Sequence, residues 1–329
     1  MTVAVVGAGS WGTALAAHLR RKGERVRVWA REPEIVTGIR EHGRNPFFLA
    51  DVDLPAGIEV ENDVNRAVEG ASLVVIAVPS EFVAVTLKSM ERVPGAAPVV
   101  SATKGLDPER HLRMSEVIAE RFPEARVAAL SGPKFAHEVA QARPTAAVIA
   151  ARDVALAAKL QEAIGTRELR LYTNADVTGV EVGGALKNVM AIATGIADGL
   201  GLGENARAAL VTRGLAEITR LAVAMGGQAA TIAGLAGLGD LVLTCTGSLS
   251  RNRALGLALA KGEGLAAHEG KTRMIAEGAR TVRSALALAR RHGVELPICD
   301  EVGAVLFDGK APAAALTALL GRAPTREGG

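Results

Sequence analysis

Three groups of residues in this chain have types and a spacing that suit chemistry. The first is a GxGxxG pattern formed by Gly7, Gly9 and Gly12. In such a pattern the first glycine permits a tight turn, the second lets a pyrophosphate approach the backbone, and the third lets a helix pack against a strand. Ser10 and Trp11 open that helix, whose N-terminus attracts phosphate groups. The pattern predicts a dinucleotide site.

An arginine follows the next expected strand and bears on which dinucleotide is bound. Arg31 stands just after the run Arg25 to Trp29. An NAD site usually carries an acidic residue there for the ribose hydroxyls, whereas an arginine accommodates the 2′-phosphate of NADP. Arg31 therefore favours NADP over NAD. Glu32 and Glu34 complicate the local field, and a solvated surface arginine is the alternative.

The second group centres on a lysine inside an apolar helical stretch. Lys187 lies in the middle of Val177 to Gly199, close to Gly183 and Gly184. Burial disfavours the ammonium form and lowers the pKa of a lysine, which suits a proton donor and acceptor near neutrality. Lys187 is the predicted catalytic residue. The alternative is a lysine whose stem lets its charge reach solvent.

The third group suits a small anionic substrate. Asp240 lies on an expected glycine turn, residues 237–241. It pairs with the helical lysine, holds a substrate hydroxyl, or merely caps a helix. Ser250, Arg251 and Asn252 open the following helix. A cap, free N–H groups and a guanidinium together suit a phosphate, although a cationic capped helix is also ordinary at a surface.

Composition argues against several other classes of function. The 38 Lys and Arg nearly balance the 35 Asp and Glu, and there is no basic tail, so no nucleic-acid partner is expected. Cys245 and Cys299 lie far apart, which argues against a disulfide framework and favours a reducing cytoplasm. His137-Glu138 begins like a zinc-binding HExxH motif, but Gln141 replaces the second histidine, so no metal is expected.

The elements that must position these residues divide the chain in two. Up to about residue 175, β-branched runs alternate with helical patterns, as in βαβ units. Beyond it the pattern is helical. We predict an α/β fold: a Rossmann domain with a doubly wound parallel sheet that binds NAD(P), residues 1–175, followed by an all-α substrate-binding domain, residues 176–329.

The expected strands and helices place the distinctive residues of the first half at strand ends. Ligands bind beyond the carboxyl ends of strands in such sheets, where Pro79-Ser80, Thr103-Lys104-Gly105 and Ser131-Gly132-Pro133 stand. Strands are expected at Val3 to Gly7, Arg25 to Trp29, Leu73 to Val78, Val99 to Ala102, Val127 to Leu130 and Ala146 to Ile149. Helices are expected at Trp11 to Lys22, Glu81 to Arg92, Pro108 to Arg121, Val177 to Gly199, Asn205 to Met225, Ser250 to Lys261, Thr281 to His292 and Asp300 to Leu306.

Charged residues interrupt every apolar run before it reaches the roughly 18 residues of a membrane helix, so no integral membrane segment is expected. A glycine turn likewise interrupts the apolar start, which argues against a signal peptide. The sequence does not decide the oligomeric state, and a homodimer is compatible with it.

Taken in order, these stretches resemble one family, the bacterial-type NAD(P)-dependent glycerol-3-phosphate dehydrogenases. The resemblance covers nearly the whole chain. It is carried by Gly7 to Ala17, Val78 to Ser80, Thr103 to Leu106, Ser131 to Pro133, Phe135 and Ala136, Val180 to Val189, Asp198 to Leu215, Gly234 to Gly247 and Leu249 to Arg253.

The resemblance implies reduction of dihydroxyacetone phosphate to sn-glycerol 3-phosphate and a supply of phospholipid backbones. It further implies that Lys187 is the proton acceptor in the oxidative direction and that Lys104 and Arg251 reach both cofactor and substrate. The cofactor site would also be lined by Ser10, Trp11, Arg31, Ala136 and Glu277, and the substrate would also be held by Gly132, Asp240, Ser250 and Asn252.

One residue departs from the pattern of that family. Lys134 stands where a serine or threonine usually follows Gly-Pro. A long cation there either adds a phosphate contact or swings to solvent, and we count Lys134 among the expected substrate-binding residues. Two other functions stay open: a related dehydrogenase of a small hydroxy acid, which would recognise a carboxylate in place of a phosphate, and a regulatory module that senses NADPH without turnover.

Overall fold

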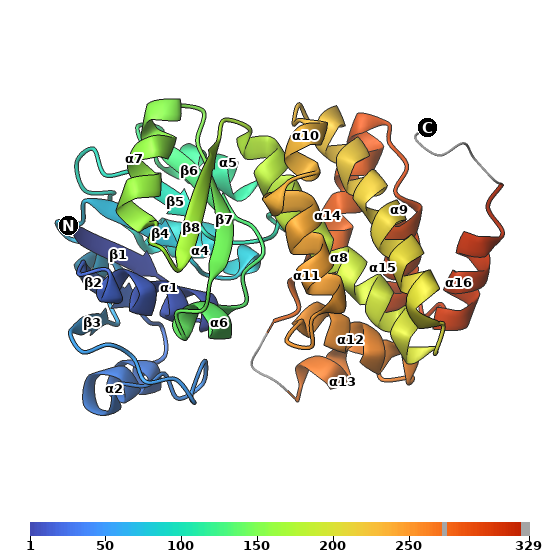
Figure 1. Ribbon diagram of the computed structural model, residues 1–329, viewed down its shortest axis with the longest axis horizontal. Helices are drawn as coiled ribbons and strands as arrows, with labels where there is room; N and C mark the ends of the chain where they lie inside the picture. The colour runs from blue at the N-terminus through green and yellow to red at the C-terminus, as the bar shows by residue number, and fades with distance from the viewer. Residues whose placement is uncertain (272–274, 324–329) are drawn as a thin grey trace.

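The computed structural model describes residues 1–271 and 275–323, which form a half built on a sheet and a helical half (Figure 1). Eight strands make one sheet in the order β3-β2-β1-β4-β5-β6-β7-β8. The strands are β1 (Thr2–Val6), β2 (Arg25–Trp29), β3 (Ile58–Glu61), β4 (Leu73–Ile76), β5 (Val99–Ser101), β6 (Val127–Ser131), β7 (Thr145–Ala150) and β8 (Leu169–Asn174).

All six predicted strands are present, and the sheet is parallel at every neighbouring pair except β6 and β7. The predicted fold class, a doubly wound α/β sheet, is confirmed. The prediction that all strands are parallel is wrong for β6 and β7, which are antiparallel. A parallel connection needs a crossover over the sheet. The link from β6 to β7 carries only the short α6 (Ala136–Ala140), which packs on α1, so β7 runs back beside β6.

The two strands that were not predicted, β3 and β8, are the two edges of the sheet. Charged or polar side chains alternate with apolar ones in Ile58–Glu61 and Leu169–Asn174. Edge strands commonly carry such residues because one side of the strand meets water. A search for continuous β-branched runs therefore finds the buried centre and overlooks the edges.

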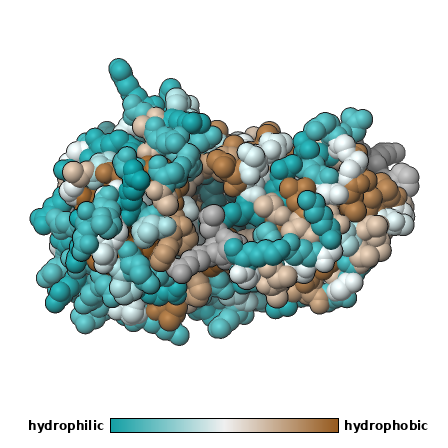
Figure 2. Space-filling view, turned by 90° about the horizontal axis from the view of Figure 1, so that it is seen from below, coloured by the Kyte–Doolittle hydropathy of each residue, from teal (hydrophilic) through white to brown (hydrophobic). Residues whose placement is uncertain are grey.

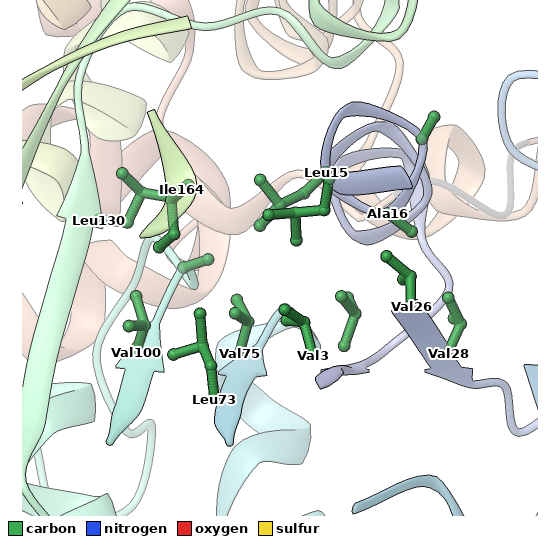
Figure 3. Close-up of a cluster of buried hydrophobic side chains, with 14 of the residues drawn as sticks. Val3, Leu15, Ala16, Val26, Val28, Leu73, Val75, Val100, Leu130 and Ile164 are labelled. Carbon is green, nitrogen blue, oxygen red and sulfur yellow. The ribbon is translucent and has the colours of Figure 1, made fainter. Parts of the chain in front are cut away.

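Helices cover both faces of the sheet, and alternate residues of each central strand face opposite layers. Figure 3 shows one layer, in which Val3, Val75 and Val100 of the sheet face Leu15 and Ala16 of α1. The opposite layer packs against α3, α4 and α5. The helices of this half are α1 (Ser10–Arg21), α2 (Pro33–His42), α3 (Val64–Val68), α4 (Ser80–Ser89), α5 (Met114–Arg121), α6 and α7 (Val154–Ile164).

Helix α5 begins six residues later than the expected start at Pro108. The Asp107 carboxylate accepts the backbone N–H of Arg110 at 2.7 Å, and His111 has a positive φ of 61°. An aspartate bonded to the backbone ahead of it competes with helix formation, so a turn precedes the helix.

The helical half is built around α8 (Val177–Gly199), the long apolar helix predicted from the sequence (Figure 1). Helices α9, α11, α12 and α14 pack on it, and its first half also packs on β6. The other elements of this half are α9 (Gly203–Ala224), α10 (Ala229–Ile232), the π-helix η1 (Leu235–Gly239), α11 (Asp240–Thr246), α12 (Arg251–Ala260), α13 (Leu265–Glu269), α14 (Glu277–His292), α15 (Pro297–Phe307) and α16 (Pro312–Leu320).

Two stretches of this half are long and apolar enough to cross a membrane, judged by length and composition alone. The expectation that none exists was too strict. Val177–Gly199 is α8, whose apolar window is wholly buried inside the molecule. Ala229–Thr246 is divided among α10, η1 and α11 and is 44% buried. Core helices of soluble proteins pass the same test, so these stretches are weak evidence for a membrane.

Candidate active site

A cleft of about 1130 Å³ lies between the two halves and draws its walls from both. Part of the recess is visible in Figure 2 between the sheet half and the helical half. The carboxyl ends of β1, β2, β4 and β5 reach it from one side, and α8, α11, α12 and α14 reach it from the other. Residues far apart in the sequence are thereby brought to one space.

The glycine turn gives this cleft a backbone cradle. Gly7 has a φ of +117°, and an added Cβ would lie 2.8 Å from the Ala77 backbone. An added Cβ at Gly9 would meet nothing within 4 Å, so the backbone there faces open space. Helix α1 begins at Ser10 without a side-chain cap, which leaves its first N–H groups for an anion. These residues fit the pyrophosphate of a dinucleotide.

Trp11 supports the same assignment. Its indole lines the cleft, and its buried Nε1 has no hydrogen-bond partner within residues 1–271 and 275–323. A buried donor without an acceptor is uncommon, and a ligand in the cleft can supply one.

Arg31 lies at the rim of the cleft, but its guanidinium already has an anionic partner. Its side chain is 67% exposed and donates to the Glu32 carboxylate at 2.6 and 3.0 Å. It also lies 5.6 Å from the centre of the Phe82 ring. Asn62 donates to the carbonyls of Ala30 and Arg31, at 2.8 Å each, which fixes the backbone at the end of β2.

Lys187 lies deep in the cleft and is 5% exposed. Its ammonium donates to the Thr244 hydroxyl at 2.5 Å and lies 3.0 Å from an Asp240 oxygen. Burial lowers the pKa of Lys187 from 10.5 to about 8, and Asp240 opposes part of that shift. The snorkelling alternative is therefore wrong, and both protonation states of Lys187 are accessible near neutral pH.

Asp240 holds two lysines at once. Its second oxygen accepts from Lys104, whose ammonium also donates to the Gly132 carbonyl at 2.9 Å. Burial alone would raise the pKa of Asp240, but Lys104, Lys187 and Lys134 together keep that pKa below its usual value. Asp240 was expected on a glycine turn; it is in fact the first residue of α11, directly after the π-helical η1.

Lys134 points into the cleft and not to solvent. Its side chain is 9% exposed, its ammonium donates to the Leu130 carbonyl at 3.2 Å, and it lies 5.0 Å from the centre of the Trp11 ring. Burial, together with the positive charge of Lys104, lowers the pKa of Lys134 well below the usual value.

The start of α12 forms another part of the wall. The Ser250 hydroxyl caps the helix by accepting the Arg253 N–H at 3.2 Å. Asn252 is held from both ends, because its amide donates to Asn188 and its carbonyl accepts the Gly278 N–H, each at 2.9 Å. Arg251 is exposed in the same helical turn and lines the cleft.

Glu277 begins α14 and joins it to the loop after β4. Its carboxylate accepts the Ser80 N–H at 3.1 Å and the Ser80 hydroxyl at 2.6 Å. Burial raises the pKa of Glu277 above its usual value, and the bonds from Ser80 oppose that rise. Glu277 therefore ties the two walls together at the cleft.

Most residues predicted from the sequence line this cleft. Gly12 and Gly132 do not line it but contact residues that do. Gly12 packs under Gly7, where an added Cβ would lie 1.9 Å from the Gly7 oxygen, and Gly132 has a φ of +129°. The predicted residues among the lining are Gly7, Gly9, Ser10, Trp11, Arg31, Lys104, Lys134, Ala136, Lys187, Asp240, Ser250, Arg251, Asn252 and Glu277.

Among the polar lining residues that were not predicted, two bond to predicted site residues, and both had a signal in the sequence. Thr244 follows Asp240 by four residues, so a helix starting at Asp240 puts both on one face. Asn188 directly follows Lys187 and carries the amide oxygen that anchors Asn252. Across the described part of the chain, no group of three metal-ligating side chains occurs, and both cysteines are buried free thiols.

Comparison with known proteins places this geometry in a family. The family model described as the N-terminus of NAD-dependent glycerol-3-phosphate dehydrogenase matches residues 2–157, and the model for its C-terminus matches residues 176–317. A glycerol-3-phosphate dehydrogenase [NAD(P)+] of Koribacter versatilis is 50% identical over 332 residues, covering 99% of this chain and 98% of that one. Its counterpart from Rhodospirillum rubrum is 48% identical over 328 residues, covering 99% and 94%.

Solved structures agree with the sequence relatives. The crystal structure of glycerol-3-phosphate dehydrogenase from Coxiella burnetii superimposes with a TM-score of 0.94 at 39% identity, covering 98% of this chain and 99% of that one. A ketopantoate reductase from Ralstonia eutropha shares the fold at a TM-score of 0.63 and 19% identity, which supports the architecture alone. From two family models that together span most of the chain, and from full-length relatives near 50% identity, the chain belongs to the NAD-dependent glycerol-3-phosphate dehydrogenases.

Proposed function

We propose that this protein interconverts dihydroxyacetone phosphate and sn-glycerol 3-phosphate with NAD(P)H. The observation that carries the proposal is the position of Lys187. Its buried ammonium faces a cleft that has a dinucleotide cradle on one wall and the N-terminus of α12, with Arg251, on another. A proton donor, a hydride carrier and a phosphate site are the three parts that this reaction needs.

In the reductive direction Lys187 polarises the keto oxygen and supplies the proton that the new alcohol requires. Thr244 and Asp240 fix the position of its ammonium. In the oxidative direction the neutral amine accepts the proton. When bound, NAD(P)H supplies the hydride that this chemistry requires. Lys104, on the other oxygen of Asp240, adds positive charge where negative charge develops on the substrate oxygen.

The phosphate group belongs at the start of α12. Free N–H groups at the helix N-terminus, the Arg251 guanidinium and the remaining Asn252 amide hydrogen can all donate to it. Ser250 completes the turn. Holding the phosphate there places the keto carbon toward Lys187, and this positioning is a large part of the rate enhancement.

The cofactor contacts that we propose follow the glycine turn. Gly7, Gly9, Ser10, Trp11 and Ala136 surround the dinucleotide, with Gly12 supporting the turn, while Lys104, Arg251 and Glu277 approach it from the facing wall. We propose that NADP is preferred, because Arg31 can turn from Glu32 to a 2′-phosphate. Lys134 and Gly132 complete the substrate side.

We also propose a cytoplasmic enzyme that supplies glycerol 3-phosphate for phospholipid synthesis, organised as a cofactor domain at residues 1–175 and a substrate domain at residues 176–329. Neither a nucleic acid nor a membrane is needed as a partner for this chemistry. A homodimer is compatible with it.

The test is NADPH oxidation, followed by absorbance, with dihydroxyacetone phosphate and with dihydroxyacetone. We expect turnover with the phosphorylated ketone only. In the Arg251→Ala variant the KM for that ketone should rise roughly 10- to 150-fold, which corresponds to the loss of a charge-assisted contact. Equal turnover of both ketones would contradict the proposal that the cleft has a phosphate-binding site. Turnover of a small keto acid alone would favour a hydroxy-acid dehydrogenase, and NADPH binding without any turnover would favour a sensor.

A further inference from the structure

Three lysines, the buried Lys134 and Lys187 and the half-buried Lys104, gather around a single carboxylate at the base of the cleft. Both oxygens of Asp240 are occupied, one by Lys187 and the other by Lys104. Lys134 is the third lysine; its ammonium donates to the Leu130 carbonyl, and Lys104 lies beside it. The cluster therefore pairs two of its amines with one carboxylate and leaves Lys134 without an ion-pair partner among the described residues.

The groups that face Lys134 disfavour its charge while the cleft holds no anion. Lys104 just after β5 and Lys187 on α8 are cations, and the one nearby anion in the described part of the chain, Asp240 on α11, is shared between them. Trp11 on α1 offers only a ring face. His137 on α6 is bonded to Asp51 at 2.6 Å. Burial and like charges thus lower the pKa of Lys134 well below its usual range.

A phosphorylated substrate changes this balance. Its phosphate is a dianion above its second pKa of about 6. With Lys134 neutral, the cluster of Lys104, Lys187, Lys134 and Asp240 carries a net charge of one. A proton on Lys134 adds a second positive charge to the cleft in which the start of α12 holds the dianion. Two N–H positions of a protonated Lys134 are then available to a ligand in the cleft.

We propose that Lys134 takes up a proton from solvent when the phosphorylated substrate binds, and that the resulting ammonium helps to hold the dianion. The inference rests on the proposed function, because it names the same substrate. The amine gains the proton on binding and returns it when product leaves the cleft. An unphosphorylated ketone brings no charge and so causes no uptake, which makes Lys134 a residue that selects for the dianion.

The measurement is calorimetric titration of dihydroxyacetone phosphate into enzyme saturated with NADP⁺, a pair that cannot react. At about pH 7, where most of the phosphate is dianionic and Lys187, with a pKa of about 8, is mostly ammonium, the titration is repeated in buffers of different ionisation enthalpy, which gives the protons taken up. We compare the wild type with Lys134→Met, Lys134→Arg and, as a control, Lys159→Met on the exposed face of α7.

Wild type and Lys159→Met should take up more protons per substrate than Lys134→Met, by an amount approaching about one. Lys134→Met should also bind the substrate roughly 10- to 150-fold more weakly. Lys134→Arg, which is always charged, should bind tightly without the extra uptake. It also keeps the test valid if the methionine variant folds poorly, which a thermal melt reveals.

Equal uptake in the wild type and both Lys134 variants would overturn the inference and leave the proposed function standing. So would uptake that occurs when NADP⁺ binds to the free enzyme and not when substrate follows, because the anion would then be the cofactor pyrophosphate. Absence of any substrate binding to the wild type would instead contradict the proposed function itself.

Discussion

Lys187 is held between a carboxylate and a hydroxyl, so the main effect of replacing it should be on the proton-transfer step. Lys187→Ala should lower turnover by roughly 10²- to 10⁴-fold, the usual contribution of a general acid or base. Cofactor affinity should change little. The variant should stay folded with a lower melting temperature, because the buried pair with Asp240 is lost while Asp240 keeps Lys104. The assay is NADPH oxidation by the purified variant. More than about a tenth of wild-type turnover, well outside that range, would exclude Lys187 as the proton-transfer residue.

The pKa of Lys187, lowered by burial to about 8, predicts opposite pH profiles for the two directions. Reduction needs the ammonium, so kcat/KM should be flat between the second pKa of the substrate phosphate, about 6, and about pH 8, and should fall above that pH. Oxidation needs the amine, so it should rise up to that pH and then level off. Asp240 raises this pKa, and Asp240→Asn should therefore move both inflections to lower pH. Inflections that stay in place would mean that another group titrates.

Arg31 predicts a preference for NADPH, although the neighbouring Glu32 carboxylate already binds its guanidinium. Arg31→Asp should weaken NADPH binding by roughly 10- to 150-fold and leave NADH binding nearly unchanged, since only NADPH carries the 2′-phosphate. The measurement is kcat/KM with NADPH and with NADH, whose ratio is compared between wild type and variant.

The matched control is Glu32→Gln. Glu32 occupies the Arg31 guanidinium, so removing its charge should strengthen NADPH binding. If neither variant alters the ratio of the two cofactors, Arg31 takes no part in the preference.

Residue types and spacing predicted the glycine turn, Lys187, Asp240 and the start of α12, because each breaks a local pattern. The contacts that side chains make across the cleft could not be predicted from the sequence. The pairing of Arg31 with Glu32 depends on side-chain rotamers, and the inward direction of Lys134 depends on Leu130 and Trp11. Neither follows from sequence spacing.

At the scale of elements, a buried ion pair joins α5 of the sheet half to α8 of the helical half. Arg113 donates to Glu181 at 3.0 Å, and Ser115 donates to the same carboxylate through its N–H at 2.8 Å and its hydroxyl at 2.5 Å. Both charged side chains are at most 7% exposed. This pair lies on the helix that carries Lys187, so it fixes that helix against the sheet.

Removing one member of a buried pair leaves a charge without compensation, which typically costs about 3 to 5 kcal/mol. Glu181→Ala should therefore lower the denaturant midpoint by an amount near the lower end of that range, because Arg113 keeps Glu116. Glu120→Ala is the control, since its exposed pair with Arg110 should be worth at most about 1 kcal/mol. Equal midpoints for the two variants would mean that the buried pair does not stabilise the junction.

Elements with a strong and continuous pattern were predicted from sequence, and those shaped by their neighbours were not. The central strands and α8 are apolar on all sides. The edge strands β3 and β8 share their pattern with surface loops. The reversed direction of β7 depends on where α6 packs, and the late start of α5 depends on one aspartate that bonds to backbone.

At the scale of the molecule, the cleft exists because α8 belongs to both cores. Its first half packs on β6, and its second half lies in the helical core. Gly195 of α8 and Gly256 of α12 allow these backbones to touch, as an added Cβ at Gly256 would lie 2.2 Å from the Ile192 oxygen. The helix that carries Lys187 is thus packed into both halves of the protein.

The chain contains only two tryptophans, Trp11 and Trp29, and both line the cleft. The tryptophan fluorescence of the protein, excited where Tyr172 does not absorb, is therefore a signal from the proposed cofactor site. Reduced nicotinamide absorbs where indole emits, so NADPH should quench this emission in proportion to occupancy. A titration should give its dissociation constant without any label or coupled assay. Trp11→Phe should remove most of the quenching if the nearer indole is the one beside the glycine turn.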